Sequence, residues 1–477
     1  MPVEEQWPVN DSSDHQPFDD QQWDQHAHNP FNWPLGRKWM VMLTSLVVTF
    51  FTGINSTSPT TAADAVSEEF NLSNDVFEYN FFDVTAWNAA AAVVPLAALP
   101  IMEAYGMRIG YLAAYALFTI FLIPQAVAQN FATLVVCRAI AGGAGGTLQN
   151  AADGVAANVF RTSQERAVPV TLYVFSLVLG VTMGPVLGAV VEPLGWRWIF
   201  WIELIINGAL APLVFFGMLE NRNEVIRSKI FPDVSEKSGT KETLQDLKET
   251  VVRSAVLLTT EPTVSSFTLW SAFSYGLVYV MSQSVPVVFT GAYGWPIFSG
   301  GLVQVSIGIG QAIGLFGCLL QDKIYIRSAR RNTESPGTPV AEAILHFSIP
   351  STPIALAGGL FMYGWSTLQS HWIVTAVGLA LVGYAIMVIV SAASIYVTDA
   401  YSGYAASAIA ALTFGENTFA AFLPLAAKPM YVRLGYPWAS SLLAFIAVAL
   451  TLAPVTLLAK GKTIRSKSKA IQEMCIQ

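Results

Sequence analysis

Residues 137–160 read CRAIAGGAGGTLQNAADGVAANVF, and residues 177–204 read LVLGVTMGPVLGAVVEPLGWRWIFWIEL. Each segment is long and apolar enough to cross a bilayer, which takes about 20 residues. A charge in the hydrocarbon core costs at least about 2.5 kcal/mol, so it needs a partner, a wet cavity or an interface. The two segments therefore predict membrane helices that line a polar site. Their ionisable and amide residues include Arg138, Gln149, Asn150, Asp153, Glu192 and Glu203.

Helical spacing places the polar residues of the first segment on one face. Arg138, Gly142, Gly145, Gln149 and Asp153 recur at steps of three and four. Arg138 and Asp153 are 15 residues apart, about 22 Å along a helix axis, so they cannot pair directly. The face is polar at both ends, and glycines without side chains lie between them.

The second segment carries a groove of glycines. Gly180, Gly184 and Gly188 are each four residues apart, so a neighbouring helix can approach closely there. Pro185 removes one backbone donor inside the groove and is expected to bend the helix. A polar face beside such a helix is typical of a bundle that opens and closes around a solute.

Composition excludes several classes of protein. The 477 residues are 53% hydrophobic and only 12% charged, which predicts an all-α polytopic membrane protein that contacts the lipid bilayer. No basic patch could meet a nucleic acid, and three distant cysteines form neither a disulfide framework nor a metal site. We find no nucleophile elbow or phosphate-binding loop, so neither an enzyme nor a cofactor is expected.

The hydropathy pattern predicts twelve spans in two halves of six. The expected organisation is a disordered cytosolic tail (1–38), a first half (39–219), a central loop (220–265), a second half (266–460) and a cytosolic tail (461–477). A surface helix is expected at 241–254. The predicted spans are 40–62, 81–101, 109–129, 132–157, 168–191, 197–218, 266–289, 300–321, 346–366, 371–397, 403–427 and 437–459.

The distribution of basic residues predicts the orientation. With both termini cytosolic, 21 of the 25 Lys and Arg residues would face the cytosol. Asn71, in the sequon Asn71-Leu72-Ser73, would then lie outside and could be glycosylated.

Several motifs resemble the major facilitator superfamily, over roughly residues 35–460. Within it the chain is similar to the fungal 12-span drug:proton antiporters, in the branch of polyamine, fluconazole and mycotoxin exporters. Arg138 and Gly142 resemble the span-four motif, and Gly180, Gly184, Pro185 and Gly188 resemble the span-five antiporter motif. Residues 100–108 resemble the loop motif between spans two and three, although Leu99 and Met107 depart from it. The resemblance implies two six-helix halves that rock about a central cavity.

The resemblance implies a role in proton coupling for Arg138, and we assign Asp153 and Glu203 as candidate titrating groups. Arg138 either holds a carboxylate or water as the proton moves, or caps carbonyls of neighbouring helices. Asp153 either takes up a proton or stays ionised in a wet vestibule. Glu203 is either a titratable site or snorkels outward beside Arg197.

Two further groups of residues are predicted. The first group matches the family's loop motifs, and the resemblance implies that it forms a cytosolic gate: Glu103, Gly106, Arg108 and Asp322. The alternative is that these charges only set the membrane topology. The second group is predicted to line the substrate cavity: Asn55, Gln149, Asn150, Tyr275, Tyr279, Gln283, Tyr396 and Glu416. The alternative is that these side chains only pack helices together. Glu416 could pair with a cation or a basic substrate, or bond Asn417.

These patterns lead to one main hypothesis. The chain is expected to be a monomeric proton-coupled antiporter in the plasma membrane that exchanges inward protons for outward small organic molecules, such as drugs or a fungal secondary metabolite. Two alternatives are open: proton-coupled uptake of a nutrient or polyamine, and a membrane sensor that does not transport.

Overall fold

The computed structural model describes residues 20–72, 84–231, 251–328, 340–401 and 404–465, and these residues form helices and loops without a strand. Eleven helical stretches of this described part are long and apolar enough to cross a membrane. The all-α polytopic architecture predicted from the sequence is therefore confirmed.

The last of these stretches, Ala405–Ala459, has 55 residues, far more than the roughly 20 that one crossing needs. It contains α18 (Ala405–Phe422) and α19 (Ala427–Arg465), joined by a 3-10 turn. Gly435 within it has φ +75°, which a regular right-handed helix cannot accommodate. We count two crossings here, which gives the twelve that hydropathy predicts.

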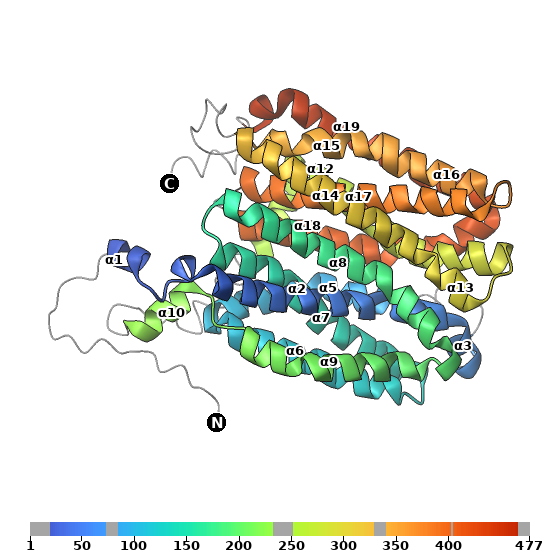
Figure 1. Cartoon of the computed structure of the whole chain (residues 1–477), viewed down its shortest axis with the longest axis horizontal. Helices are drawn as coiled ribbons and strands as arrows, with labels where there is room; N and C mark the ends of the chain where they lie inside the picture. The colour runs from blue at the N-terminus through green and yellow to red at the C-terminus, as the bar shows by residue number, and fades with distance from the viewer. Residues whose placement is uncertain (1–19, 73–83, 232–250, 329–339, 402–403, 466–477) are drawn as a thin grey trace.

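The crossings form two groups that lie side by side (Figure 1). The first group comprises α2 (Leu35–Thr57), α5 (Ala86–Tyr105), α6 (Met107–Ala126), α7 (Phe131–Val159), α8 (Ser163–Val191) and α9 (Arg197–Gly217). The second group comprises α12 (Pro262–Pro286), α13 (Ile297–Leu302), α14 (Gln304–Ser328), α15 (Leu345–Ser351), α16 (Gly358–Ser366), α17 (Trp372–Ala400), α18 and α19. The groups meet where α5 packs against α18 and where α8 packs against α14.

Two pairs of short helices mark the opposite ends of the bundle (Figure 1). α1 (Asp20–Gln25) and α10 (Asn223–Ile230) lie at one end, called the α10 end below. α3 (Ala63–Glu69) and α13 lie at the other, called the α3 end. The helix expected at 241–254 lies mostly outside the described residues, although 251–260 are helical.

The N-terminal segment is more ordered than the sequence predicts. We expected a disordered tail over residues 1–38; residues 1–19 lie outside the described part, whereas residues 20–25 form α1 and α2 begins at Leu35. Trp23 is 6% exposed, and the Asn29 side chain donates to its carbonyl oxygen at 3.2 Å. Asp24 forms an ion pair of 2.9 Å with Arg161, beyond the end of α7. Trp23 also meets Phe231 edge-on, which ties this segment to α10.

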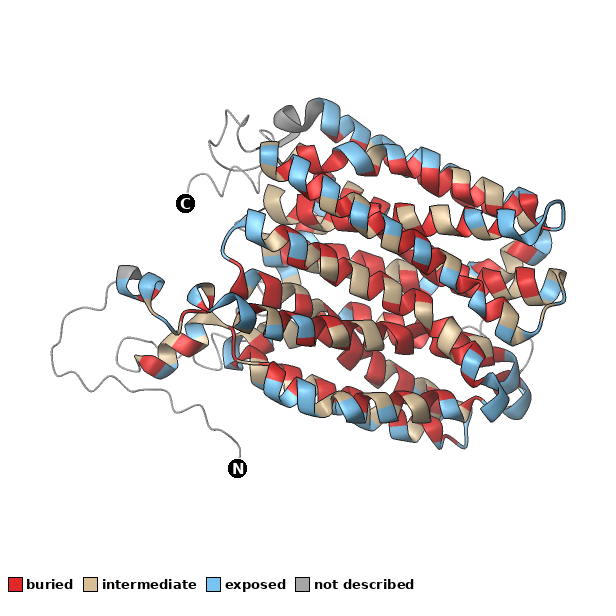
Figure 2. Cartoon of the chain, viewed as in Figure 1, coloured by how far each residue is buried: buried red, intermediate tan, exposed pale blue. Residues whose placement is uncertain are grey.

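Exposed residues lie along the outer faces of the helices (Figure 2), and many of them are large and hydrophobic. Large hydrophobic side chains such as Phe216, Phe316 and Ile354 are 67–73% exposed. On a soluble protein such an apolar surface would promote aggregation, whereas lipid tails solvate it well. Polar side chains are correspondingly buried between the helices, where they can form a site.

Candidate functional site

Arg138 is fully buried in the middle of the first group. It extends from α7 toward α2, where Nη1 donates to the backbone oxygen of Asn55 at 2.9 Å and to Asn55 Oδ1 at 3.2 Å. Nη2 donates to the backbone oxygen of Ser56 at 3.2 Å. Arg138 therefore binds carbonyls of a neighbouring helix, as one of the two interpretations predicted. It also binds the side chain of Asn55.

The Asn55 side chain also contacts Glu203 on α9. Asn55 Nδ2 donates to Glu203 Oε2 at 2.5 Å, and Ser58 Oγ donates to Oε1 at 2.5 Å. Trp87 on α5 donates to Asn55 Oδ1 at 2.9 Å, which fixes the orientation of the amide. Glu203 is only 3% exposed, so it points inward instead of snorkelling beside Arg197, which pairs with Glu69.

The network continues into the second helix group. Ser56 Oγ lies 3.3 Å from Tyr279 Oη on α12, and Tyr279 Oη lies 3.2 Å from Tyr275 Oη. All three side chains are buried. A continuous set of polar contacts therefore joins Glu203, α2 and the interface between the two groups. The predicted cavity residues Tyr275 and Tyr279 lie in this layer.

The glycine groove of α8 receives α2. A Cβ added to Gly53 would lie 3.1 Å from the Gly180 Cα atom, so two glycines face each other across the contact. A Cβ on Gly184 would collide with Thr57 and Ile54 and would lie 2.8 Å from Ser58 N. Gly188 continues the contact, since it faces Ser58, whereas the carbonyl of Pro185 faces Gly301 of α13 in the second group. The glycines thus hold α8 against the helix that contacts Arg138.

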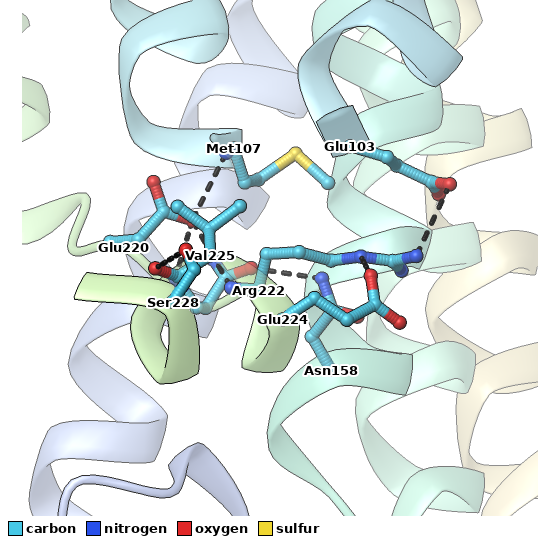
Figure 3. A network of polar contacts seen from close by, with 9 residues as sticks. Glu103, Met107, Asn158, Glu220, Arg222, Glu224, Val225 and Ser228 are labelled. Carbon is cyan, nitrogen blue, oxygen red and sulfur yellow. Dashed lines mark hydrogen bonds and ion pairs between the residues drawn. The ribbon is translucent and has the colours of Figure 1, made fainter. Parts of the chain in front are cut away.

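A compact polar cluster lies at the α10 end (Figure 3). Glu220 is 3% exposed and accepts hydrogen bonds from four backbone N–H groups, including Met107 N at 3.0 Å and Arg108 N at 3.3 Å. It therefore caps the N-terminus of α6, where a carboxylate is stabilised by the helix dipole. Gly106 has φ +119°, and a Cβ there would lie 2.7 Å from Glu220 Oε2.

The predicted gate residues divide between two places. Glu103 pairs with Arg222 at 3.6 Å, and Arg108 donates to the backbone oxygen of Phe215 at 3.3 Å, both within the first group. Asp322 instead reaches across the groups, because Thr171 Oγ1 on α8 donates to its Oδ2 at 3.1 Å. Its Oδ1 is buried without a hydrogen-bond partner among the described residues.

A cavity of about 300 Å³ opens between the groups at the α10 end. Asn150 and Asp153 of α7 line it, together with Arg166 of α8 and Thr413 of α18. A second cavity, of about 390 Å³, lies at the α3 end and includes Gln283. The layer around Ser56 and Tyr279 lies between the two cavities.

The other predicted cavity residues are buried between helices. Gln149 Nε2 donates to Thr52 Oγ1 of α2 at 3.3 Å. Tyr396 stacks on Phe267 with ring centroids 4.3 Å apart. Glu416 accepts a hydrogen bond of 2.5 Å from Ser271 of α12, whereas Asn417 donates to the carbonyl of Thr413, so the hydrogen bond between Glu416 and Asn417, one of the two alternatives, is not formed among the described residues.

Sequence reasoning missed several partners in these contacts. Glu220 and Arg222 looked like ordinary loop charges, and their burial beside α6 depends on how the loop folds back. Ser58 and Ser271 gave no signal, because a serine in an apolar helix is common. The packing of distant helices places these two serines beside carboxylates that are 145 residues away in the sequence. No group of residues in the described part could hold a metal ion.

Comparison with known proteins gives consistent results. Residues 41–339 match the model of the Major Facilitator Superfamily. The chain is 34% identical to the MFS transporter cpaT of Aspergillus oryzae over 92% of this chain and 90% of that protein. It is 32% identical to the efflux pump radE of Floropilus chiversii over 92% of this chain and 83% of the pump.

A solved structure shows the same fold. The crystal structure of the human organic anion transporter MFSD10 superposes with a TM-score of 0.61 at 16% identity, covering 89% of this chain and 100% of that one. With this fold and these relatives, the chain is a multi-pass membrane transporter that belongs to the Major Facilitator Superfamily.

Proposed function

We propose that the chain is a monomeric proton-coupled antiporter that exports small organic molecules across the plasma membrane, with both termini in the cytosol. The observation that carries this proposal is the buried path from Glu203 through Asn55 to Arg138. An ionisable pair that deep in a membrane protein is costly, and such groups usually serve transport or proton movement. The relative named an efflux pump supports the outward direction.

The geometry suggests how a proton would change the helix packing. Both carboxylate oxygens of Glu203 accept hydrogen bonds, one from Asn55 and one from Ser58. When a proton binds to either oxygen, that oxygen becomes a donor and a weaker acceptor, so the hydrogen bond that it accepts weakens. Both donors belong to the α2 segment, which also contacts the α8 glycines and Tyr279. Protonation at Glu203 is thereby linked to the interface between the groups.

The remaining predicted roles fit into this mechanism. Asp153 would bind the solute or a second proton in the cavity at the α10 end, which we take to be cytosolic. The contacts of Glu103, Gly106 and Arg108 would hold that end of the first group rigid as it rocks. Asp322 and Thr171 would break and re-form a contact between the groups in each cycle.

The test begins with yeast that lacks its own exporters. Cells expressing the chain are expected to accumulate less of at least one compound in a panel of labelled hydrophobic compounds, and a protonophore should abolish the difference. The purified protein in liposomes should then move that compound when a pH gradient is imposed.

Glu203→Gln is the decisive variant. Glutamine keeps the size of the side chain but cannot exchange a proton, so gradient-driven transport should fall at least tenfold while downhill exchange of the compound remains. Glu192→Gln, at an exposed position beyond α8, is the matched control and should transport normally. Full gradient-driven transport by Glu203→Gln would contradict Glu203 as the coupling group, and raised accumulation in cells would contradict export.

A further inference from the structure

A helix of the central loop forms part of the wall of the cavity at the α10 end. This helix, Val251–Thr260, presents Val251 and Ser254 to the cavity. The two positions are three residues apart and share one helix face. Ser254 is 5% exposed, whereas Val252 and Val256 on the other face are 51% and 47% exposed. The helix therefore has a defined orientation, with one face turned to the cavity.

The Val251–Thr260 helix is attached to the second helix group. Glu261, which directly follows it, accepts a hydrogen bond of 3.2 Å from Tyr401 Oη, just beyond the end of α17. The Arg253 guanidinium lies 4.8 Å from the centre of the Tyr404 ring, just before α18, in a cation–π contact. The helix is therefore expected to move with the second group.

The other end of the central loop contacts the same cavity from the first group. Arg222 lies in the cavity wall, just before α10. Its guanidinium pairs with Glu103 of α5 at 3.6 Å, and its backbone N–H donates to Glu220 at 3.1 Å. Because Glu220 also caps α6, Arg222 is held within the first group. Rocking of the two groups would therefore change the distance between Arg222 and Ser254.

The Val251–Thr260 helix lies at the mouth of the cavity. It contacts the turn between α17 and α18, directly before Ala405. α18 lines the cavity from Ala405, its first residue, to Thr413, which is about 12 Å further along the helix axis. Val251 and Ser254 are therefore near the outer edge of the cavity, and Thr413 is in its deeper part.

We propose that Val251 and Ser254 form the entrance to the solute site, opposite Arg222, and set the size of the solutes that reach its deeper part. The proposal rests on the proposed export function and names residues that determine its specificity. The cavity of about 300 Å³ is at the lower end of the usual range for ligand pockets, about 300–1,000 Å³. A larger side chain at the entrance would therefore exclude large solutes before small ones.

Two reagents of the same chemistry and different size test the entrance. The three natural cysteines are replaced by alanine, and Thr413→Cys places a thiol in the deeper part of the cavity. The purified full chain in lipid nanodiscs is treated with N-ethylmaleimide, a small reagent, or with fluorescein-5-maleimide, a large one. Mass spectrometry follows the rate of each reaction.

Tryptophan substitutions on the two faces of the helix identify the residues responsible. Ser254→Trp is expected to slow the reaction of fluorescein-5-maleimide at least tenfold and that of N-ethylmaleimide less than twofold. Val251→Trp should act in the same direction, because it narrows the entrance from the same wall. Val256→Trp adds the same side chain to the exposed face, and both reagents should react with this matched control at the original rates. A melting curve shows that each variant is folded, and Val251→Trp carries the test if Ser254→Trp does not fold.

The outcomes separate the entrance from the export proposal. The entrance would be overturned if fluorescein-5-maleimide did not react with Thr413→Cys alone, if both reagents were slowed equally, or if the control slowed the reaction as much as Ser254→Trp and Val251→Trp. Export by cells together with any of these results would leave the antiporter standing without the entrance. Selective slowing of the large reagent without transport in a pH gradient would instead support the entrance and contradict the antiporter.

Discussion

Asn55 donates a hydrogen bond of 2.5 Å to Glu203 across 148 positions of sequence, and the same amide accepts from Arg138 through its oxygen. An amide is suited to this place, because it offers an acceptor to a cation and a donor to a carboxylate at once. A carboxylate in its place would repel Glu203, and a hydroxyl would be too short to reach both partners.

Replacement of Asn55 by alanine should therefore destabilise the protein strongly. Arg138 and Glu203 would each lose a hydrogen bond in a buried site, and a hydrogen bond to a charged group contributes about 1.5–3 kcal/mol. Thermal unfolding of the purified protein in detergent measures the loss. Asn32→Ala is the control, since the exposed Asn32 side chain bonds only backbone oxygens of the N-terminal segment. Similar melting curves for the two variants would contradict a structural role for the amide.

The contact between α8 and α2 leads to a second prediction. Gly184→Leu would force a side chain against Ile54, Thr57 and Ser58, so α2 would have to shift away from α8. We expect at least a tenfold loss of transport with normal delivery to the cell surface. Gly208→Leu places the same side chain on α9, where nothing lies within 4 Å of the added Cβ, and it should transport like the wild type. Transport by Gly184→Leu at the wild-type rate would show that the close contact is dispensable.

The sequence predicts the fold far better than the site. Apolar runs of about 20 residues identify the spans, because lipid imposes the same requirement on every crossing. The glycine spacing of α8 likewise predicts that a helix approaches there, but not that the helix is α2. Pairings such as Asn55 with Glu203 depend on how distant helices pack, and a single sequence carries no record of that.

The N-terminal segment shows a second limit. Its many Asp, Gln and His residues predict disorder, since a polar segment cannot bury enough apolar surface to offset its lost entropy. Trp23 supplies part of that surface, since Phe231 after α10 packs against it and the Asp24–Arg161 ion pair joins the segment to the end of α7. The partner surface is formed by residues more than 100 positions away, so local composition could not reveal it.

The turn at Gly106 gives a third prediction. Comparison with Gly195 separates the cost of backbone strain from the cost of a steric clash with Glu220. Gly106→Ala should lose stability because φ is +119° and because the added Cβ would press on Glu220. Gly195→Ala has a similar φ of +93° but open space around its Cβ, so it should show only the backbone strain, of about 1–3 kcal/mol. We expect Gly106→Ala to melt at a clearly lower temperature. Equal losses would mean that Glu220 moves aside freely and that its cap on α6 contributes little.

Asn71 tests the orientation of the whole molecule. It is exposed at the end of α3, on the far side of the bundle from α10, and its φ of 49° turns the chain away from the helix. If the α3 end faces the outside, the sequon passes through the secretory lumen and can receive a glycan. The wild type made in yeast should then shift to a lower apparent mass after endoglycosidase treatment, and Asn71→Gln should already run at that mass. Asn55 heads a second sequon but is fully buried beside Glu203, so it should not contribute. A cysteine placed at Asn71 offers an independent readout, because an impermeant maleimide should label it in intact cells. Labelling only after the cells are broken would reverse the assigned orientation, and with it the side from which the α10-end cavity is loaded.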